Sequence, residues 1–195
     1  MSNLYNYNTM AVERKAKLET LTIVARTLEL KNPYTEKHSQ DMIDNAIKIA
    51  KELDISDNLS LENIKYGAML HDIGKLATPD NILNKRGKLT EDEFNVIKAH
   101  PVIGYELLKS IYEPIGLMIK SHHERIDGNG YPEGLTGDKI CLFAKIIAVC
   151  DVYDALISER PYKEPMSKNK ALSIIEEGAG THFDKEIVNI FLKIA

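Results

Sequence analysis

The sequence predicts an all-α protein that forms a single domain. Apolar residues recur at spacings of three and four along almost the whole chain, and no run alternates with a period of two. No internal repeat, low-complexity tract or interdomain linker interrupts this pattern. The length of 195 residues suffices for one domain with a sizeable hydrophobic core.

The first predicted helix covers residues 9–30. Val12, Ile23 and Val24 recur along it, and we interpret this stripe as core packing in preference to a dimer seam. Pro33 ends the helix, because a proline in a helix interior removes a hydrogen bond.

A second helix begins near Thr35 and a third begins near Ser60, whose hydroxyl is expected to cap it. The third helix leads directly into His71 and Asp72. Residues 74–89 contain Pro, Gly, Asn and Lys and are therefore predicted to form a loop.

Thr90 followed by Glu93 is a capping-box pattern, which predicts a helix that ends near His100. Two further helices are expected over residues 102–110 and 113–123.

An irregular, glycine-rich segment follows over residues 127–138. A long apolar helix is predicted over 140–158, and two shorter helices over 167–177 and 184–194 complete the chain.

The charge balance disfavours a general nucleic-acid binder. The net charge is −4 and the isoelectric point is about 5.9, whereas such binders usually carry a basic face. An acidic protein can still bind an anion where positive charge is concentrated in one cleft.

The sequence also favours a cytoplasmic location. Residues 1–10 lack the apolar core of a secretory signal, and the longest apolar run, 146–150, is too short to cross a bilayer. Cys141 and Cys150 lack CxxC spacing and are expected to be small buried hydrophobes in a reducing compartment.

Histidines beside acidic residues indicate a metal site. His71 precedes Asp72, and the adjacent His122 and His123 precede the glycine-rich segment. Imidazole and carboxylate ligands suit iron, manganese, nickel or zinc, and the absence of a thiolate pattern disfavours structural zinc.

Mixed His and Asp ligands on several helices suit a pair of metal ions about 3.5–4 Å apart. Such a pair lowers the pKa of bound water from about 15.7 to about 7 and neutralises phosphate oxygens. Hydrolysis of a phosphodiester is the reaction that this set of ligands fits best.

Four strings in this order strongly resemble the HD-GYP family, and the match runs from about Lys31 to the C-terminus. The strings are His71-Asp72-Ile73-Gly74-Lys75, His100-Pro101-x-x-Gly104, His122-His123-Glu124-Arg125 with Asp127-Gly128-x-Gly130-Tyr131-Pro132, and Asp151-Val152-Tyr153-Asp154-Ala155-Leu156. The resemblance implies an all-α HD-superfamily helical bundle over residues 31–195. Residues 1–30 are expected to form an N-terminal helix that serves packing or dimerisation. It also implies a central metal site beside a glycine-rich loop.

The family hydrolyses cyclic di-GMP to the linear dinucleotide pGpG, in some members onward to GMP, with a metal-bridging hydroxide. The resemblance therefore implies metal ligands in two groups that share the bridging Asp72. These ligands are His38, His71, Asp72 and Asp151 for one ion, and Asp72, His100, His122 and His123 for the other.

The resemblance also assigns contacts to the substrate. Lys75 matches the lysine at the scissile phosphate and, with Asp72, forms the implied catalytic pair. Arg160 and Lys163 match residues that grip the phosphates. The family's named loop, which borders the site and is linked to contacts with partners, corresponds to Gly130, Tyr131 and Pro132.

One departure bears on the number of metals. Family members with three metals carry Glu four residues before the first ligand, where this chain has Tyr34. Glu36 lies on the wrong face of a helix to replace it. We therefore expect two divalent ions, iron or manganese first and nickel or zinc next, and the second cleavage to GMP stays open.

Other residues near the motifs receive structural interpretations. His182, Asp127 and Asp154 are not expected to bind metal, and Arg125 either contacts substrate or braces the glycine-rich loop. Lys145 stands where the family often has Arg, and no function is attached to it.

Three alternatives remain beside cyclic di-GMP hydrolysis. They are activity on a mixed GMP–AMP cyclic dinucleotide, a generic HD nucleotidase, and a non-catalytic module that binds cyclic dinucleotide or docks a diguanylate cyclase. A sensory or receiver domain is a further candidate partner, whereas duplex DNA or RNA and a membrane are not expected. Homodimerisation stays open.

Overall fold

The computed structural model describes residues 2–30, 38–85, 87–158 and 164–195. Within these ranges it is helical and has no strand, which confirms the predicted all-α class. The α-helices are α1 Ser2–Leu30, α2 His38–Glu52, α3 Asn58–Leu70, α4 Asp80–Leu83, α5 Glu91–Lys98, α6 His100–Ser121, α7 Leu142–Ile157, α8 Lys168–Glu177 and α9 Lys185–Ile194, and the 3-10 helices are η1 Ile73–Ala77 and η2 Gly137–Lys139.

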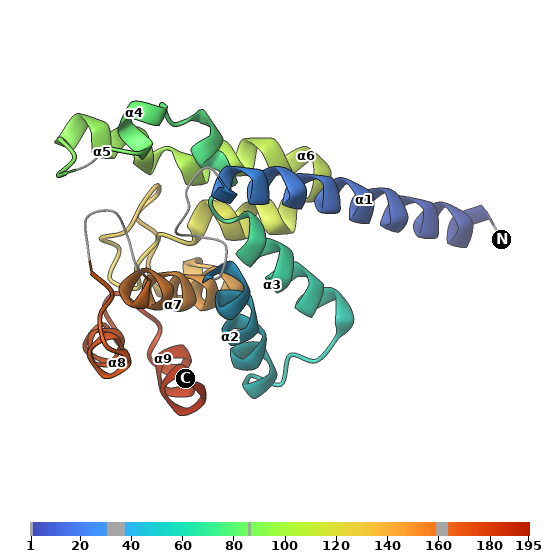
Figure 1. Cartoon of the computed structure of the whole chain (residues 1–195). Coiled ribbons are helices and arrows are strands. Elements are labelled where there is room, and N and C mark those ends of the chain that lie inside the picture. Colours follow the sequence, from blue (N-terminus) through green and yellow to red (C-terminus); the bar gives the residue numbers. More distant parts are fainter. Residues whose placement is uncertain (1, 31–37, 86, 159–163) are drawn as a thin grey trace.

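The helices pack around α3 and α7 (Figure 1). α2 lies against α3, α7 and α9, and α8 and α9 close the C-terminal end. α1 lies along α3 and α6, and its N-terminal part projects away from the other helices (Figure 1). The predicted division into a helix over 1–30 and a domain over 31–195 stays a prediction.

Two clusters of buried apolar side chains form the core. The larger cluster joins α2, α3, α7, α8 and α9, and includes Ile64, Ile146 and Phe191. The smaller cluster joins α1, α3, η1 and α6, and includes Leu70 and Ile115. α3 contributes to both clusters, so its C-terminal end, at His71, lies where the two clusters meet.

Local signals explain where several helices begin. The predicted capping box of Thr90 and Glu93 is present at the start of α5, with both reciprocal hydrogen bonds formed. The prediction that Ser60 caps α3 is wrong. The carboxylate of Asp57 accepts from the backbone N–H of Ser60, so Asp57 is the cap.

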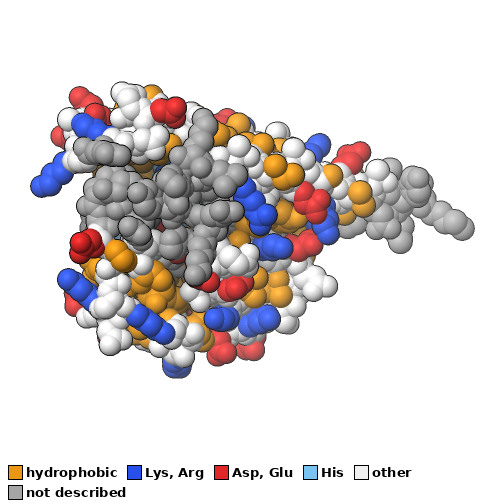
Figure 2. Space-filling view, viewed as in Figure 1, with side chains coloured by type: hydrophobic (Ala, Val, Ile, Leu, Met, Phe, Trp, Pro, Cys, Tyr) orange, Lys and Arg blue, Asp and Glu red, His pale blue; other side chains and the backbone are white. Residues whose placement is uncertain are grey.

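The interpretation of the α1 stripe as core packing is also wrong. Val12 and Ile23 are about two-thirds exposed, and apolar side chains reach the surface of α1 between charged ones (Figure 2). The buried face instead carries Leu18, Thr22 and Ala25. The hydroxyl of Thr22 can be buried because it donates to the Leu18 carbonyl at 2.9 Å.

The segment between α3 and α6 is more ordered than predicted. Residues 74–89, expected to be a loop, contain most of η1 and all of α4. The two helices expected over 102–110 and 113–123 are the two arms of α6, which begins earlier than predicted, at His100. Tyr112 interrupts the helical backbone between the arms, with φ −161° and ψ 95°.

α7 is the most apolar helix and supplies much of the larger core. Cys150 is buried in it as predicted, but Cys141 is exposed at its N-cap, so the prediction of burial fails for that residue. Among the residues that the structure describes, none of the helices combines the length and apolar character that crossing a bilayer requires.

Candidate metal centre

The bend in α6 brings its two ends together. A straight helix of 22 residues would be about 33 Å long, yet the Nε2 atoms of His100 and His122 lie only 3.4 Å apart. The two arms pack closely because Gly104 faces Ile119 and Gly116 faces Tyr105. α6 is therefore a helical hairpin whose open end carries imidazoles from both arms.

A second close approach places His71 and Asp72 beside this end. α3 ends at Leu70, and the chain turns through Asp72 into η1, which packs on α6. A Cβ atom at Gly74 would overlap the carbonyl oxygen of His100 and lie 2.8 Å from the backbone nitrogen of Gly104. The lack of a side chain at Gly74 is what allows the two backbones to meet.

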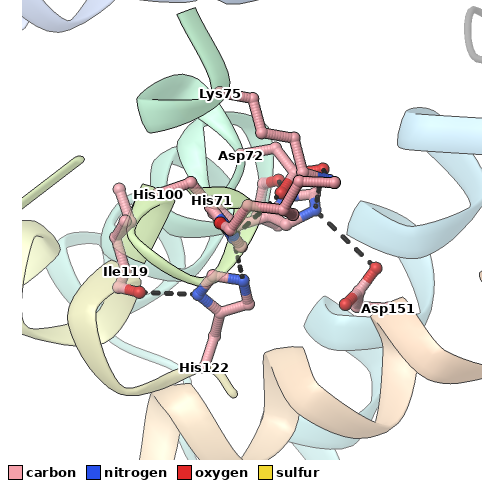
Figure 3. Close-up of polar contacts among 9 residues, drawn as sticks. His71, Asp72, Lys75, His100, Ile119, His122 and Asp151 are labelled. Atoms are coloured by element: carbon pink, nitrogen blue, oxygen red, sulfur yellow. Dashed lines mark hydrogen bonds and ion pairs between the residues drawn. The ribbon is translucent and has the colours of Figure 1, made fainter. Parts of the chain in front are cut away.

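Three of the imidazoles are oriented by the same local hydrogen bond. In each ring Nδ1 donates to the carbonyl oxygen three residues earlier, which leaves Nε2 to face the centre of the cluster (Figure 3). The pairs are His71 with Ala68 at 2.7 Å, His100 with Ile97 at 2.8 Å and His122 with Ile119 at 2.6 Å.

The carboxylate of Asp72 lies between two groups of side chains (Figure 3). Its Oδ2 lies 3.3 Å from Nε2 of His71 and 2.5 Å from Nζ of Lys75. Its Oδ1 lies 3.3 Å from Nε2 of His100. From α7, Oδ1 of Asp151 approaches Nε2 of His71 at 3.7 Å.

These atoms fit divalent cations. Ligand atoms of Asp72, His100, His122 and His123 all lie within 4.8 Å of one another. Oδ1 of Asp72 is buried without a hydrogen-bond partner among the described residues. The lone pairs of two neutral imidazoles, those of His100 and His122, face each other, an arrangement that a cation between them would stabilise.

The protonation state of His100, His122 and His123 favours metal ligation. Burial lowers the pKa of His100, and burial with the neighbouring His123 imidazole holds the pKa of His122 well below its usual range. Burial also lowers the pKa of His123 to about 4. These three rings are therefore neutral at pH 7, as metal ligation requires.

The side of the cluster formed by His71, Asp72 and Asp151 carries a proton. Burial by itself would lower the pKa of His71, but the carboxylates of Asp72 and Asp151 raise it to about 9. Burial would raise the pKa of Asp72, but the Lys75 ammonium and the His71 imidazole hold it well below its usual range. A proton thus occupies the position between His71 and its carboxylates that a cation would take.

The glycine-rich loop is fastened beside this cluster. The ring of Tyr131 stacks on His123 with centroids 4.8 Å apart, and its backbone N–H donates to the His123 carbonyl at 3.1 Å. The Tyr131–Pro132 peptide bond is cis. Of the loop residues predicted to contact substrate, Tyr131 thus lies against an imidazole of the cluster.

Glu124 is a site residue that sequence reasoning missed. Its side chain is buried, and its two oxygens accept from the backbone N–H groups of Glu133 at 2.7 Å and Leu135 at 2.9 Å. The sequence did contain a signal for this role. A carboxylate stands directly after the histidine pair, and the irregular loop that follows has backbone N–H groups that need an acceptor.

The other residues singled out in the sequence either make a contact that the structure shows or lie outside the residues that it describes. Arg125 donates to both oxygens of Asp127, at 3.1 and 2.7 Å, so it braces the loop. His182 stacks on Phe183, and Lys145 pairs with Asp184, the cap of α9. The side chain of His38, at the start of α2, lies outside the described part, as do Tyr34, Glu36, Arg160 and Lys163.

The chain resembles known proteins over most of its length. The model of the HD domain family matches residues 22–187. The chain is 45% identical over 179 residues to the cyclic di-GMP phosphodiesterase response regulator RpfG of Xanthomonas campestris, an alignment that covers 90% of this chain and 47% of that protein.

Two further comparisons extend this result. The 3′3′-cGAMP-specific phosphodiesterase 3 of Vibrio cholerae is 39% identical over 168 residues, which cover 85% of this chain and 36% of that protein. A solved HDG“Y”P protein from Bdellovibrio bacteriovorus superposes with a TM-score of 0.65 at 22% identity, over 80% of this chain and 51% of that one, and so shares the fold. The chain spans less than half the length of either curated relative.

Proposed function

The chain belongs to the HD domain family, and we propose that it is a metal-dependent phosphodiesterase that hydrolyses cyclic di-GMP to the linear dinucleotide pGpG. The four HD-GYP strings and the relative described as a cyclic di-GMP phosphodiesterase support this substrate. The proposal includes the cytoplasm as location. A diguanylate cyclase or a sensory domain as partner stays a prediction.

One observation carries the proposal, namely the position of the Asp72 carboxylate between two sets of ligands. Oδ2 faces His71 and Oδ1 faces His100, each at 3.3 Å. A carboxylate that bridges in this way would hold two cations side by side, which is the arrangement used to hydrolyse phosphodiesters.

We assign one cation to His38, His71, Asp72 and Asp151, and the other to Asp72, His100, His122 and His123. The proposal names two ions, with iron or manganese preferred, because the donors are imidazole and carboxylate without thiolate. When bound, these cations would supply Lewis acidity toward the phosphate and a source of hydroxide near neutral pH.

The chain's own side chains position the substrate. Lys75 now pairs with Oδ2 of Asp72, and that oxygen would turn to a cation on metal binding. The freed ammonium would then lie beside the scissile phosphate and stabilise the charge that develops on it. Arg160 and Lys163 are proposed to bind the phosphates, and the Gly130-Tyr131-Pro132 segment to border the bound nucleotide.

A mixed GMP–AMP cyclic dinucleotide is the second candidate substrate. The observation that favours it is the 39% identity to the cGAMP-specific phosphodiesterase 3 of Vibrio cholerae. Both substrates contain two phosphodiester bonds in one ring, so the same metal centre would act on either. Contacts with the bases would decide between them.

The test is reconstitution of the purified protein with ferrous iron or manganese under anaerobic conditions. Cyclic di-GMP, the mixed cyclic dinucleotide and a mononucleotide are supplied separately, and products are separated by chromatography. We expect pGpG from cyclic di-GMP, with about two metals per chain. Asp72→Ala is the matched variant and should abolish both metal binding and turnover.

Three other outcomes would change the assignment. Faster turnover of the mixed substrate would move it to that nucleotide, and a preference for mononucleotides would indicate a generic HD nucleotidase. Tight binding of cyclic dinucleotide without hydrolysis under every metal tested would indicate a non-catalytic sensor or docking module.

A further inference from the structure

Lys98, the last residue of α5, lies over the ring of Tyr131, the residue that stacks on His123 of the cluster. Its Nζ is 4.8 Å from the ring centroid of Phe94 and 5.4 Å from that of Tyr131. Lys98 precedes His100 by two residues, and Tyr131 stacks on His123. Lys98 is therefore close to the cluster both along the chain, near His100, and in space, across the Tyr131 ring.

Among the described residues, Lys98 has no acidic partner, unlike the lysines near it. Lys75 pairs with Asp72, Lys85 with Glu93 and Lys120 with Glu133, at 2.5 to 2.7 Å. For Lys98, no carboxylate oxygen of the described residues lies within 4.0 Å, and the contacts found for its ammonium are the two rings.

The two rings also restrict the side chain. Lys98 is half-buried, and its ammonium is attracted to the two aromatic faces by cation–π interaction while its N–H groups remain able to donate. A lysine that is already ordered loses less side-chain entropy when it binds an anion. Lys98 thus has the charge and the restricted position of an anion-binding group.

We propose that Lys98 binds the second phosphate of the cyclic dinucleotide, the one that is not being cleaved. This inference rests on the proposed function, because it needs a substrate with two phosphates. While Lys75 serves the scissile phosphate at the metals, Lys98 holds the other phosphate from the side of Tyr131, in addition to the contacts proposed for Arg160 and Lys163. Lys98 then makes the enzyme select a cyclic dinucleotide over a simple phosphodiester.

The experiment compares Lys98→Met with wild type on cyclic di-GMP and on bis(p-nitrophenyl) phosphate, which has a single phosphate. Methionine keeps an unbranched apolar stem and removes the charge. We expect KM for cyclic di-GMP to rise about tenfold or more, as the loss of a charge-assisted hydrogen bond predicts, with kcat within about twofold. The ratio of the two kcat/KM values should shift by the same factor toward the simple diester.

Lys109→Met is the matched control. Lys109 also lies over an aromatic ring, 5.8 Å from the centroid of Tyr105, but its ammonium pairs with Glu106 and it stands nine residues after His100 along α6. Its kinetic constants should equal those of wild type. Lys98→Arg, which keeps the charge, should restore most of the affinity for cyclic di-GMP.

The possible outcomes distinguish a failure of the proposed function from a failure of this inference. Wild-type protein that never hydrolyses cyclic di-GMP overturns the proposed function and this inference with it. Wild-type turnover combined with an unchanged KM in Lys98→Met overturns the inference alone. An equal loss on both substrates, with Lys98→Arg as impaired as Lys98→Met, would make Lys98 a structural residue and likewise overturn it.

Discussion

The Nε2 atoms of His100 and His122 lie 3.4 Å apart although the two residues stand at opposite ends of α6. The helical backbone is interrupted at Tyr112, whose ring is contacted by Arg14 of α1 at 4.5 Å and whose hydroxyl accepts from Asn63 of α3 at 3.4 Å. The site thus depends on a bend that α1 and α3 hold from outside.

The close approach of η1 to α6 should tolerate no side chain at Gly74. In Gly74→Ala the added methyl group would overlap the His100 carbonyl, so the backbones must separate. Overpacking of this kind costs about 1–3 kcal/mol, and the shift should also move Asp72 away from His100. Urea unfolding and a metal count check this, and a variant with wild-type stability and metal content would contradict it.

Much of the helical order could be predicted from the sequence. Apolar periodicity and capping patterns depend on neighbouring residues, so α5, α8 and α9 appear where expected, with α5 started by its capping box. The ligand-bearing strings were also visible, because several long motifs occur in one order.

Features that depend on distant packing were not predictable. α1 carries apolar residues around its circumference, so only its contacts with α3 and α6 decide that Leu18 is buried and Ile23 exposed. The convergence of His100 and His122 depends on how sharply the chain folds at Tyr112, and periodicity does not encode that angle. The role of Glu124 appears only when the loop it binds is in place.

The two sets of ligands should be separable by substitution. Asp151 lies 3.7 Å from His71 and is assigned to one set alone in the proposed function, whereas Asp72 faces both. We expect Asp151→Ala to lower the metal content from about two ions to about one, and Asp72→Ala to remove both. Elemental analysis of the reconstituted variants checks this. Equal metal loss in the two variants would argue against a shared carboxylate.

Metal binding should release a proton from His71. Its pKa of about 9 in the metal-free protein means that the ring is charged at pH 7 to 8, and a cation must displace that proton. Affinity should therefore rise as the pH rises toward 9 and level off above it. Calorimetry at pH 8 in buffers of different ionisation enthalpy measures the release, which we expect to include about one proton per chain from His71 in addition to the proton lost by metal-bound water.

The metal-free Asp151→Asn variant provides a control for the cause. Loss of that carboxylate removes one of the charges that raise the pKa of His71, so less of the ring is protonated at pH 8. The pKa of His71, followed by NMR without metal, should therefore be lower in this variant than in wild type. An unchanged pKa would show that Asp151 does not hold the proton on His71.

Glu124 should act on the site through the loop that it holds. In Glu124→Ala the partly buried N–H groups of Glu133 and Leu135 lose their acceptor, which costs at most about 1–3 kcal/mol for each group left unpaired. The loop carrying Tyr131 should loosen, so turnover should fall although the metal ligands are intact.

Glu133→Ala removes only a half-exposed ion pair with Lys120 and should leave stability near that of wild type. Urea unfolding and metal counts are compared for Glu124→Ala and Glu133→Ala. Equal stability of the two variants would mean that Glu124 does not anchor the loop. A loss of metal in Glu124→Ala would mean that Glu124 supports the ligands directly.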